Sequence, residues 1–491
     1  MTTVLQLRNH ICHIIRRCSL PIYACSMAIQ PSMTEKISDG LPIPQRYGAI
    51  ATLVLGVFVA VLDGTIANVA LPTIARDLGV SAAESIWIIN ANYLAVVIAL
   101  LPLSSLGDII GYRRIYLIGI AVFSMTSLAC ALSDSLWTLT LARILQGLAA
   151  AGVMSVNIAL MRLIYPHRYI SRGMGVNALT VAVSSVAGPA ITAGILSVAT
   201  WPWLFAINAP IGIVVLLLGL RYLPAGPVRD HLHRFDGWSA VLNALTFGLL
   251  IIALSGFAQR QEILLTLAEL TGALLIGTFF VRRQLHQPRP LLPVDLLRIP
   301  IFAFSIGTSF CSFSAQMLAF VSLPFFLQDV LGKSEVATGL LLTPWMLATM
   351  VLAPIAGYLS EKFNTGLLSS VGLGLFSAGM LSLALLPSQP SDLNIIWRMA
   401  LCGIGFGLFQ TPNNHAMISS TPLHRSGIGG GIAGTARLFG QAAGAALVAL
   451  MFNLFDHRGT HASLFLGALL AALAMVVSGM RIRRLAIADQ A

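Results

Sequence analysis

The stretch Leu62-Asp63-Gly64-Thr65-Ile66-Ala67-Asn68-Val69-Ala70-Leu71-Pro72 closes the first long apolar run of the chain, which extends from about Tyr47 to Leu71. An ionised carboxylate inside hydrocarbon costs several kcal/mol, so such a residue usually has a partner or a function. Only two carboxylates of the sequence, Asp63 and Glu269, fall inside a run long enough to cross a bilayer. The stretch therefore predicts a membrane-spanning helix, and its acid is the first candidate for a functional residue.

The composition predicts the same class of protein for the whole chain. Hydrophobic residues make up 57% of the 491 residues and charged residues 10%, whereas soluble proteins carry about 25% charged residues. The net charge of +11 does not indicate a nucleic-acid partner, because the positive residues lie in short loops between apolar runs, where they report topology. No Cys-x-x-Cys pair occurs, so neither a metal site nor a disulfide framework is predicted.

Fourteen apolar runs have about the 20 residues that a bilayer-spanning helix needs. Lys and Arg gather in alternate loops, as at Arg113 and Arg114, which assigns those loops and both termini to the cytoplasm of a bacterial-type inner membrane. The predicted spans are 47–71, 85–106, 115–132, 136–161, 173–198, 203–222, 238–257, 263–281, 301–327, 335–359, 366–386, 394–418, 427–454 and 460–480.

The longest internal cytoplasmic segments, near 223–236 and 282–300, flank helices seven and eight. This spacing predicts an all-α polytopic fold of two six-helix bundles with an inserted helix pair. An acid recurs at the same step of each half, at Asp108 after helix two and at Glu361 after helix ten, as expected for parallel repeats. The expected parts are a cytoplasmic tail 1–46 with an alternative start at Met33, a bundle 47–222, a linker with the helix pair 223–300, a bundle 301–480 and a cytoplasmic tail 481–491.

The loop after helix two resembles the signature of the major facilitator superfamily between helices two and three. Asp108, Gly111 and Arg113 match that signature and Arg114 follows them, whereas Tyr112 replaces its first Arg. The resemblance implies that Asp108 latches the outward-facing state by lying against the positive N-terminal end of a helix in the other half. We group these residues with Glu361 as a candidate conformational gate. The alternative is an ordinary turn with cytoplasmic charges.

Helix four carries Arg143 and Gly147 in a stretch, 139–147, that resembles another motif of this family. Arg143 and Asp63 lie at a similar depth, roughly 10–12 Å from the same membrane face at 1.5 Å per residue. Two opposite charges at one depth can pair or communicate through water. Alternatively, Arg143 only bonds backbone carbonyls and locks helix packing.

Helix five resembles the antiporter motif of the family through Gly175, Gly188 and Pro189. Small residues let helices approach closely and Pro bends the helix, and the resemblance implies export rather than uptake. Together with the Trp-rich stretch 201–212 and fourteen spans, it places residues 47–480 near the drug:proton antiporters of the QacA/EmrB type. The resemblance is specific for the family and not for the substrate.

Two further charged residues fall inside predicted spans. Arg437 lies near the midplane of helix thirteen, roughly 15 Å deep, so it should face the bundle interior or a wet cavity. Either structural pairing or a role in substrate or proton coupling would explain it. Glu269 in helix eight competes with Asp63 as the coupling acid, although the resemblance implies that helix eight lies off the central cavity.

We therefore expect a non-enzymatic, proton-coupled multidrug exporter that moves lipophilic compounds, with cations favoured, by alternating access. A lipophilic cation would favour an anionic Asp63 and a proton would neutralise it, so the two would compete. The Gly-rich run 427–431 is not followed by Gly-Lys-Ser/Thr, so it is no phosphate loop, and the proton gradient replaces any cofactor. The expected partners are a small lipophilic substrate, protons and membrane lipids, and a monomer is compatible with the sequence.

Two alternatives remain open at this point. One is a proton-coupled carrier of an endogenous metabolite, an amphiphile or a siderophore. The other is a receptor or scaffold that transports nothing. The charges at Asp63, Arg143 and Arg437 argue against a scaffold, because it gains nothing from burying them.

Overall fold

A computed structural model of the chain describes residues 40–225, 235–258, 261–287, 290–387, 389–421, 426–455 and 458–488. The predicted N-terminal tail up to Asp39, with its alternative start at Met33, lies outside the described residues, as do residues 489–491 of the C-terminal tail.

Within the described residues, fourteen helices are long and apolar enough to cross a membrane. The predicted number of spans and the all-α membrane class are confirmed. The helices are α3 (Ile43–Asp77), α4 (Ala82–Ile110), α5 (Tyr112–Ala131), α6 (Leu136–Ile164), α7 (Ile170–Leu196), α8 (Pro202–Ala206) and α9 (Asn208–Tyr222) as one span, α10 (Gly237–Ala258), α11 (Ile263–His286), α12 (Pro300–Phe325), α13 (Glu335–Lys362), α14 (Thr365–Ala384), α15 (Asp392–Ser419), α16 (Ser426–Phe455) and α17 (Gly459–Ala488).

Serine residues begin the corresponding helices of the two halves. Ser81 and Ser135 cap α4 and α6, and Ser334 and Ser391 cap α13 and α15; each side chain accepts a hydrogen bond from a backbone N–H of the first turn. Such caps satisfy N–H groups that have no partner within the helix. Helices two, four, ten and twelve thus start in the same way, which agrees with the predicted repeat.

Glycines allow the same helix pairs to touch in both halves. A Cβ atom at Gly147 of α6 would lie 2.5 Å from the carbonyl oxygen of Asn92 in α4. In the second half, a Cβ atom at Gly403 of α15 would collide with the carbonyl oxygen of Trp345 in α13. Only a residue without a Cβ permits such close packing, which is how membrane helices associate.

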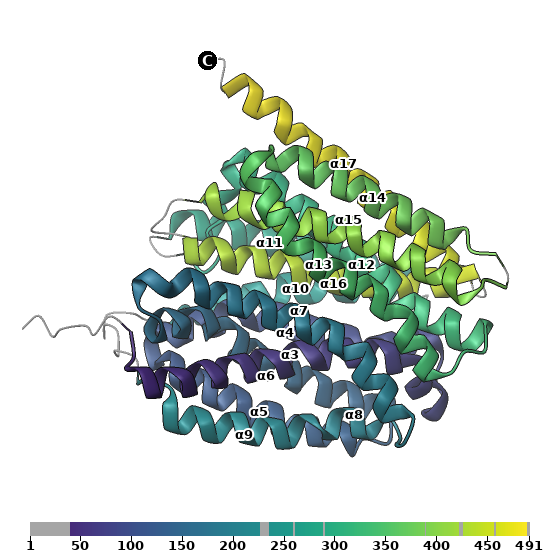
Figure 1. The fold of residues 1–491 in the computed structure, drawn as a ribbon, viewed down its shortest axis with the longest axis horizontal. Helices are drawn as coiled ribbons and strands as arrows, with labels where there is room; N and C mark the ends of the chain where they lie inside the picture. Colours follow the sequence, from purple (N-terminus) through teal and green to yellow (C-terminus); the bar gives the residue numbers. More distant parts are fainter. Residues whose placement is uncertain are drawn as a thin grey trace, which may run out of the picture. The chain divides into compact units, whose positions relative to one another are not determined.

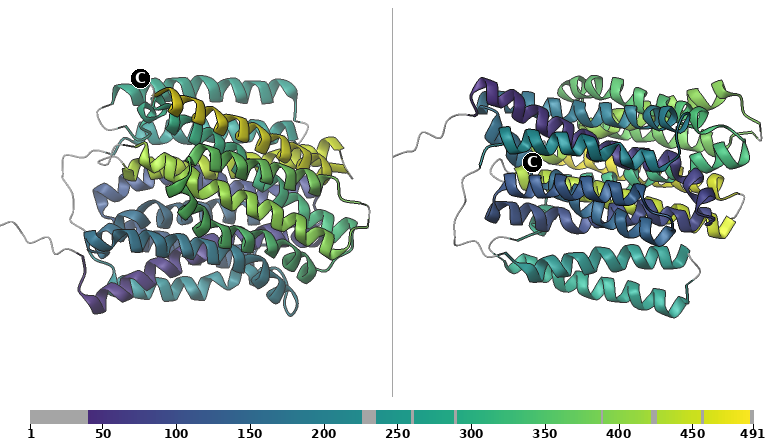
Figure 2. Two further views of the ribbon diagram at one scale, coloured as in Figure 1. Left: turned by 45° about the horizontal axis from the view of Figure 1, so that its top comes forward. Right: turned by 90° about the horizontal axis from the view of Figure 1, so that it is seen from below.

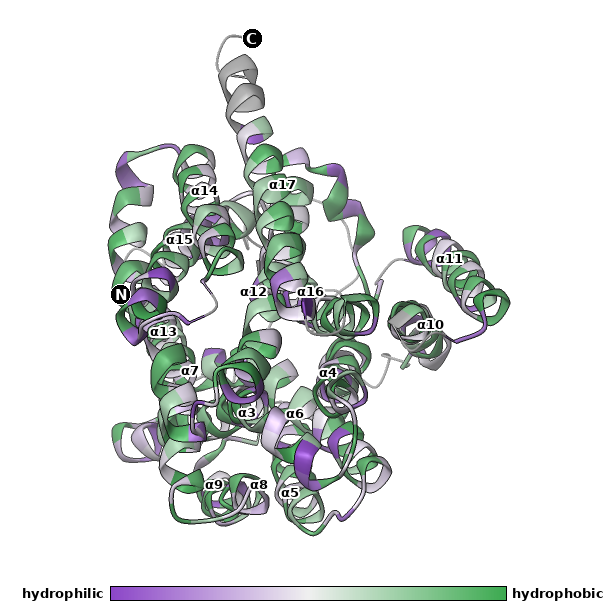
Figure 3. Ribbon diagram, turned by 90° about the vertical axis from the view of Figure 1, so that its right-hand side faces the viewer, coloured by the Kyte–Doolittle hydropathy of each residue, from purple (hydrophilic) through white to green (hydrophobic). Residues whose placement is uncertain are grey.

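The helices of the first half, α3 to α9, lie together, and so do those of the second half, α12 to α17 (Figure 1). The halves meet where α4 packs against α16, α7 against α13 and α3 against α12. The helices α10 and α11 run side by side (Figure 2), and α10 contacts α4 and α16 at one side of the bundles (Figure 3). The predicted domain boundaries themselves stay a prediction.

Two names describe the ends of the helices below. The arginine-rich end is the one at which α4 ends and the loop with Arg113 and Arg114 lies. The opposite end is the one at which Ser81 and Ser135 begin α4 and α6.

Arg481 is the first residue of the predicted cytoplasmic C-terminal tail. The helix α17 continues past it, and the side chain is only 1% exposed. It donates hydrogen bonds to Ser305, Asn413 and Ser478 at distances of 2.6 to 2.8 Å. A guanidinium can be buried here because neutral acceptors surround it.

The close contact of α6 with α4 gives a first test. We expect Gly147→Val to destabilise the protein by about 1–3 kcal/mol, because the side chain would force the two backbones apart. Gly175 of α7 is the matched control, since no atom lies within 4 Å of a Cβ built there. Gly175→Ala should leave stability unchanged or raise it by up to ~1 kcal/mol. Thermal unfolding of the purified variants in detergent measures both, and an equal midpoint for the two variants would contradict the packing described.

Candidate functional site

A buried ion pair joins the first and fourth spanning helices. An Nη of Arg143, on α6, lies 2.6 Å from Oδ2 of Asp63, on α3, and the two side chains are 1% and 3% exposed. The equal depths that the sequence indicates thus correspond to a direct pair. Removing one partner of a buried pair leaves an uncompensated charge, which typically costs about 3–5 kcal/mol.

The second oxygen of Asp63 accepts two further hydrogen bonds. Gln146 of α6 donates from 3.0 Å and Asn208 of α9 donates from 2.9 Å. All partners of the carboxylate are therefore donors, and a proton on Asp63 would have to displace at least one of them. The arrangement is suited to an ionised carboxylate.

Arg143 also bonds backbone, in addition to its pair with Asp63, and its role in coupling stays a prediction. Its Nε donates to the carbonyl oxygen of Ile88 in α4 at 3.3 Å, and its Nη1 donates to Oε1 of Gln146 at 2.6 Å. The guanidinium also lies 5.4 Å from the centre of the Phe205 ring. These contacts connect α3, α4, α6 and α8 around one cation.

Sequence reasoning gave Gln146 and Asn208 no role, although both fall inside stretches that resemble family motifs. An amide inside a spanning helix is a usable signal, because a buried amide needs hydrogen-bond partners. Their periodicity does not reveal that both turn toward Asp63.

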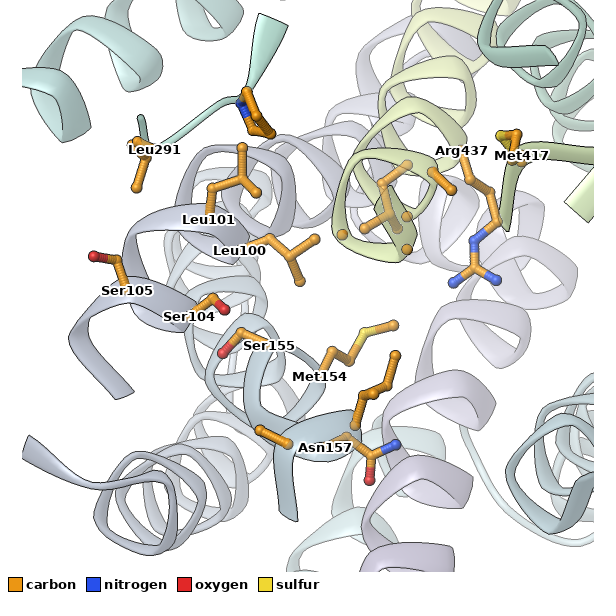
Figure 4. Close-up of a pocket in the computed structure, with 18 of the residues that line it drawn as sticks. Leu100, Leu101, Ser104, Ser105, Met154, Ser155, Asn157, Leu291, Met417 and Arg437 are labelled. Atoms are coloured by element: carbon orange, nitrogen blue, oxygen red, sulfur yellow. The ribbon is translucent and has the colours of Figure 1, made fainter. Parts of the chain in front are cut away.

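A cavity of about 1850 Å³ separates the two bundles at the arginine-rich end. Its walls come from α3, α4, α6 and α7 on one side and from α12, α15 and α16 on the other, and residues of α11 and of the segment 290–295 also line it. Figure 4 shows part of this lining. Apolar side chains alternate with amides and serines in the lining, and Asp63 and Arg143 do not belong to it. The lining includes Val57, Leu100, Ser104, Asp108, Met154, Ser155, Asn157, Arg162, Phe313, Gln410, Asn414 and Arg437.

At the opposite end, a polar cluster that we call the clasp closes the gap between the bundles. Thr73 and Arg76 of α3 both bond Oε1 of Gln328, at 3.2 and 3.0 Å, and both lie within 3.4 Å of Glu335 at the start of α13. Gln328 returns a hydrogen bond to the carbonyl oxygen of Val69 at 3.2 Å. The structure is therefore closed at the opposite end and open at the arginine-rich end.

Of the candidate gate residues, only Asp108 belongs to the cavity lining, and none of the five makes an ion pair between the bundles among the described residues. Asp108 is exposed and accepts a hydrogen bond from the Tyr112 hydroxyl of the same loop. Gly111 has φ +101°, a conformation that side chains rarely adopt. Arg113 donates to the carbonyl oxygen of Leu220 near the C-terminal end of α9, where a cation is favourable.

Arg114 and Glu361, the other two gate candidates, are exposed. The bundles stand apart at the arginine-rich end, so a latch between them has no partner within reach in this arrangement. The roles of the five gate residues stay predictions.

The antiporter stretch of α7 has one packed part and one open part. A Cβ atom at Gly188 would collide with the Thr65 side chain of α3, and the carbonyl oxygen of Pro189 lies where Gly339 of α13 permits close approach. Gly175 has open space around it. The expectation of close packing therefore holds around Pro189 and is wrong at Gly175, which is exposed.

Glu269 lies on α11, outside the cavity lining. Gln261 donates to one of its oxygens at 3.2 Å, and its other oxygen is buried without a hydrogen-bond partner among the described residues. The structure therefore does not bring Glu269 together with Asp63, Arg143 or Arg437. No group of three or more His, Cys, Asp and Glu side chains within the described residues could hold a metal ion.

Comparison with known sequences identifies the family of the chain. The sequence profile described as Major Facilitator Superfamily matches residues 53–445. The Uncharacterized transporter YebQ of Escherichia coli (strain K12) is 63% identical, over 92% of this chain and 98% of its own length. The Riboflavin transporter RibZ of Clostridioides difficile (strain 630) is 29% identical, over 83% of this chain and 88% of its own length. The Multidrug resistance protein Stp of Mycobacterium tuberculosis (strain CDC 1551 / Oshkosh) is 30% identical, over 80% of this chain and 73% of its own length.

Comparison with solved structures agrees on the fold. A bacterial homologue of the human lysosomal transporter Spinster, solved in an inward-facing and unoccupied conformation, superposes with a TM-score of 0.65. The two sequences are 15% identical, and the match covers 90% of this chain and 98% of the other. At this identity the likeness concerns the fold alone.

The buried ion pair gives a second test. We expect Asp63→Leu and Arg143→Met to lower stability by about 3–5 kcal/mol each, because each leaves an unpaired buried charge. The double variant should lose less than the sum, since it buries no charge. Arg283→Ala is the control, because it removes a partly exposed pair with Asp236 and should cost at most about 1 kcal/mol. Additive losses in the double variant, measured by thermal unfolding, would disprove the coupling.

Proposed function

The chain belongs to the Major Facilitator Superfamily, and we propose that it is a proton-driven exporter of lipophilic small molecules that works by alternating access. The observation that carries this proposal is the combination of a buried Asp63–Arg143 pair with a large cavity open at one end only. A transporter of this type needs a site that can hold a proton and a chamber that opens to one side at a time.

The open end supports the loading step of an exporter. The distribution of Lys and Arg assigns the arginine-rich end to the cytoplasm. A substrate from the cytoplasm or the inner leaflet would then enter the cavity while the clasp closes the other side. Release would require the clasp to open and the cavity mouth to close.

Asp63 is the group that we assign to the proton. In the outward-open state, a proton that reached Asp63 would release Arg143 and change the contacts of α3. The same helix carries Thr73 and Arg76 of the clasp, the latter about 20 Å from Asp63 along the helix. A shift of α3 on protonation can therefore reach the clasp. Loss of the proton to the cytoplasm would restore the pair seen in the structure.

The relatives support a small-molecule cargo and leave two substrate classes. Stp is named a multidrug resistance protein, which favours drug efflux. RibZ is named a riboflavin transporter, which favours the second candidate, a proton-coupled carrier of an endogenous metabolite. The similarity to transporters and the size of the cavity both argue against a scaffold.

The position of Asp63 bears on which charge the substrate carries. The expected preference for cations depends on Asp63 as a shared site for proton and substrate. Asp63 is enclosed by Arg143, Gln146 and Asn208 and does not line the cavity. A cation in the cavity would therefore not meet this carboxylate in the state described, and we propose that the proton and the substrate occupy different sites.

The assignment of the proton to Asp63 can be tested in proteoliposomes with an imposed pH gradient. We expect Asp63→Asn to reduce gradient-driven transport of riboflavin, fluorescein and rhodamine 123 to the level of empty liposomes, because an amide carries no proton. Glu269→Gln changes the other membrane carboxylate in the same way and should transport at the wild-type rate. Transport at the wild-type rate by Asp63→Asn would contradict the assignment of the proton to Asp63. Loss of transport in Glu269→Gln would assign the proton to Glu269 instead.

The clasp can be tested through its central cation. We expect Arg76→Ala to shift the equilibrium toward opening by about 1 kcal/mol, or roughly fivefold, because exposed ion pairs contribute little each. Distances between spin labels on the ends of α3 and α13 measure the shift. Lys333→Ala is the control, since its pair with Asp392 lies at the same end but within the second bundle. Equal distance distributions for the two variants would show that the clasp does not stabilise the closed arrangement of the bundles at this end.

A further inference from the structure

An unpaired cation lies in the wall of the cavity between the bundles. Arg437 is about 16 Å along α16 from its first residue, at 1.5 Å per residue. Figure 4 shows its side chain running away from Met417, so that the guanidinium ends in the space on the side of Met154. Within the described residues it has neither a hydrogen bond nor an ion pair, and its Nε is buried without a partner. Its guanidinium carbon lies 5.9 Å from the centre of the Phe313 ring.

Arg481, a buried arginine of the second bundle, shows how a guanidinium is held by the protein itself in this chain. Arg481 donates to Ser305, Asn413 and Ser478 and so satisfies both terminal nitrogens. Among the described residues, no side chain or carbonyl oxygen accepts a hydrogen bond from the terminal nitrogens of Arg437, and the Nε of both arginines is without a partner. Arg437 is partly exposed to the cavity. Because no described residue of the protein accepts from its guanidinium, a ligand in the cavity can supply the acceptors.

No acid of the lining lies at the depth of Arg437. Asp108 lies in the last turn of α4, and Asp236 and Asp295 lie in the segments that flank the inserted helix pair. Asp236 is already paired with Arg283 at 3.2 Å. Its partial burial alone would raise the pKa, but hydrogen bonds from Ser239 and Gln287 and the nearby guanidinium lower the pKa to about 2. The inner part of the cavity therefore carries one uncompensated positive charge.

The surroundings of Arg437 define the rest of the ligand. Val57, Leu100, Met154 and Leu438 supply apolar walls. Phe313 adds an aromatic face and is held edge-on against Phe406 with ring centres 5.3 Å apart. A guanidinium binds carboxylates and similar anions through two parallel hydrogen bonds, and it repels cations where water is scarce. The site fits an apolar or aromatic body that carries an anionic group.

We propose that Arg437 binds the anionic group of an amphiphilic organic acid, so that the cavity selects organic anions over lipophilic cations. This inference rests on the proposed function, because it names the substrate class of that same cavity. It also reverses the preference for cations that the sequence suggested. A soluble aromatic acid and a fatty acid from the membrane share this chemistry, and competition separates them.

Equilibrium binding tests the site without transport. Fluorescein and rhodamine 123 share a xanthene ring system but are an anion and a cation at neutral pH, and fluorescence anisotropy with purified protein in nanodiscs measures their affinities. We expect wild-type protein to bind fluorescein more tightly than rhodamine 123. Arg437→Gln should weaken fluorescein binding by roughly 10- to 100-fold, the effect of losing a hydrogen-bonded charge pair. The fluorescein affinity of Arg437→Lys should lie between those of the wild type and Arg437→Gln, because lysine keeps the charge and loses the bidentate hydrogen-bond geometry.

Arg162→Gln is the control for a general charge effect. Arg162 lines the same cavity but is exposed at the arginine-rich end of α6, so its loss should change fluorescein binding by less than about threefold, as expected for a screened surface charge. The thermal midpoint of each variant shows whether it is folded. Competition with naphthoate or with oleate then identifies the source, and displacement by either supports the proposal. Unchanged fluorescein binding in Arg437→Gln, tighter binding of rhodamine 123 to wild type, or displacement by neither acid would overturn it.

The two proposals fail in different ways. If fluorescein binds through Arg437 but a pH gradient does not move it, the anion site stands and proton-driven export falls. If the gradient drives rhodamine 123 out and fluorescein does not bind, export stands and the anion site falls.

Discussion

The ion pair of Asp63 and Arg143 is the interaction on which the first bundle depends. Neither charge could be buried alone at an acceptable free energy, and together they recruit Gln146 and Asn208 as further partners. The pair therefore fixes the relative positions of α3, α6 and α9, and through Ile88 also that of α4. A site that holds four helices together also transmits any change in its own charge to all of them.

The second bundle differs from the first in how its charged side chains are partnered. Arg437 is unpaired and faces the cavity, whereas Asp63 is paired and enclosed. Competition between a proton and a cation for one carboxylate, which the sequence suggested, needs both to reach Asp63 from the cavity. If the proton and the substrate occupy separate sites, as we propose, coupling would act through helix positions instead. The helix α3 is suited to this, because it carries Asp63, packs against α12 and α7 and ends in the clasp.

Much of the fold could be predicted because the length and the hydropathy of each apolar run indicate a spanning helix. The depth of Asp63 and Arg143 could be counted along two helices, and counting was sufficient to suggest their contact. Gln146 and Asn208 were missed, because spacing does not show which way an amide turns. The burial of Arg481 could not be predicted for a related reason: a cation at a helix end is usually exposed, and only the packing of α12, α15 and α17 reveals its acceptors. The latch at Asp108 depends on the conformational state, which a sequence does not specify.

The two halves share their scaffold and differ in their charges. Serine caps and close glycine contacts recur on corresponding helices, at Gly147 in one half and Gly403 in the other. The acid–base pair has no counterpart among the described residues of the second half, where neutral groups accept from both terminal nitrogens of Arg481 and no described group accepts from Arg437. A repeated fold needs its helix contacts in both halves, so the repeated residues belong to packing. The residues that break the repeat are free of that demand, and among them only a side chain that lacks a partner within the protein has a reason to find one in a ligand.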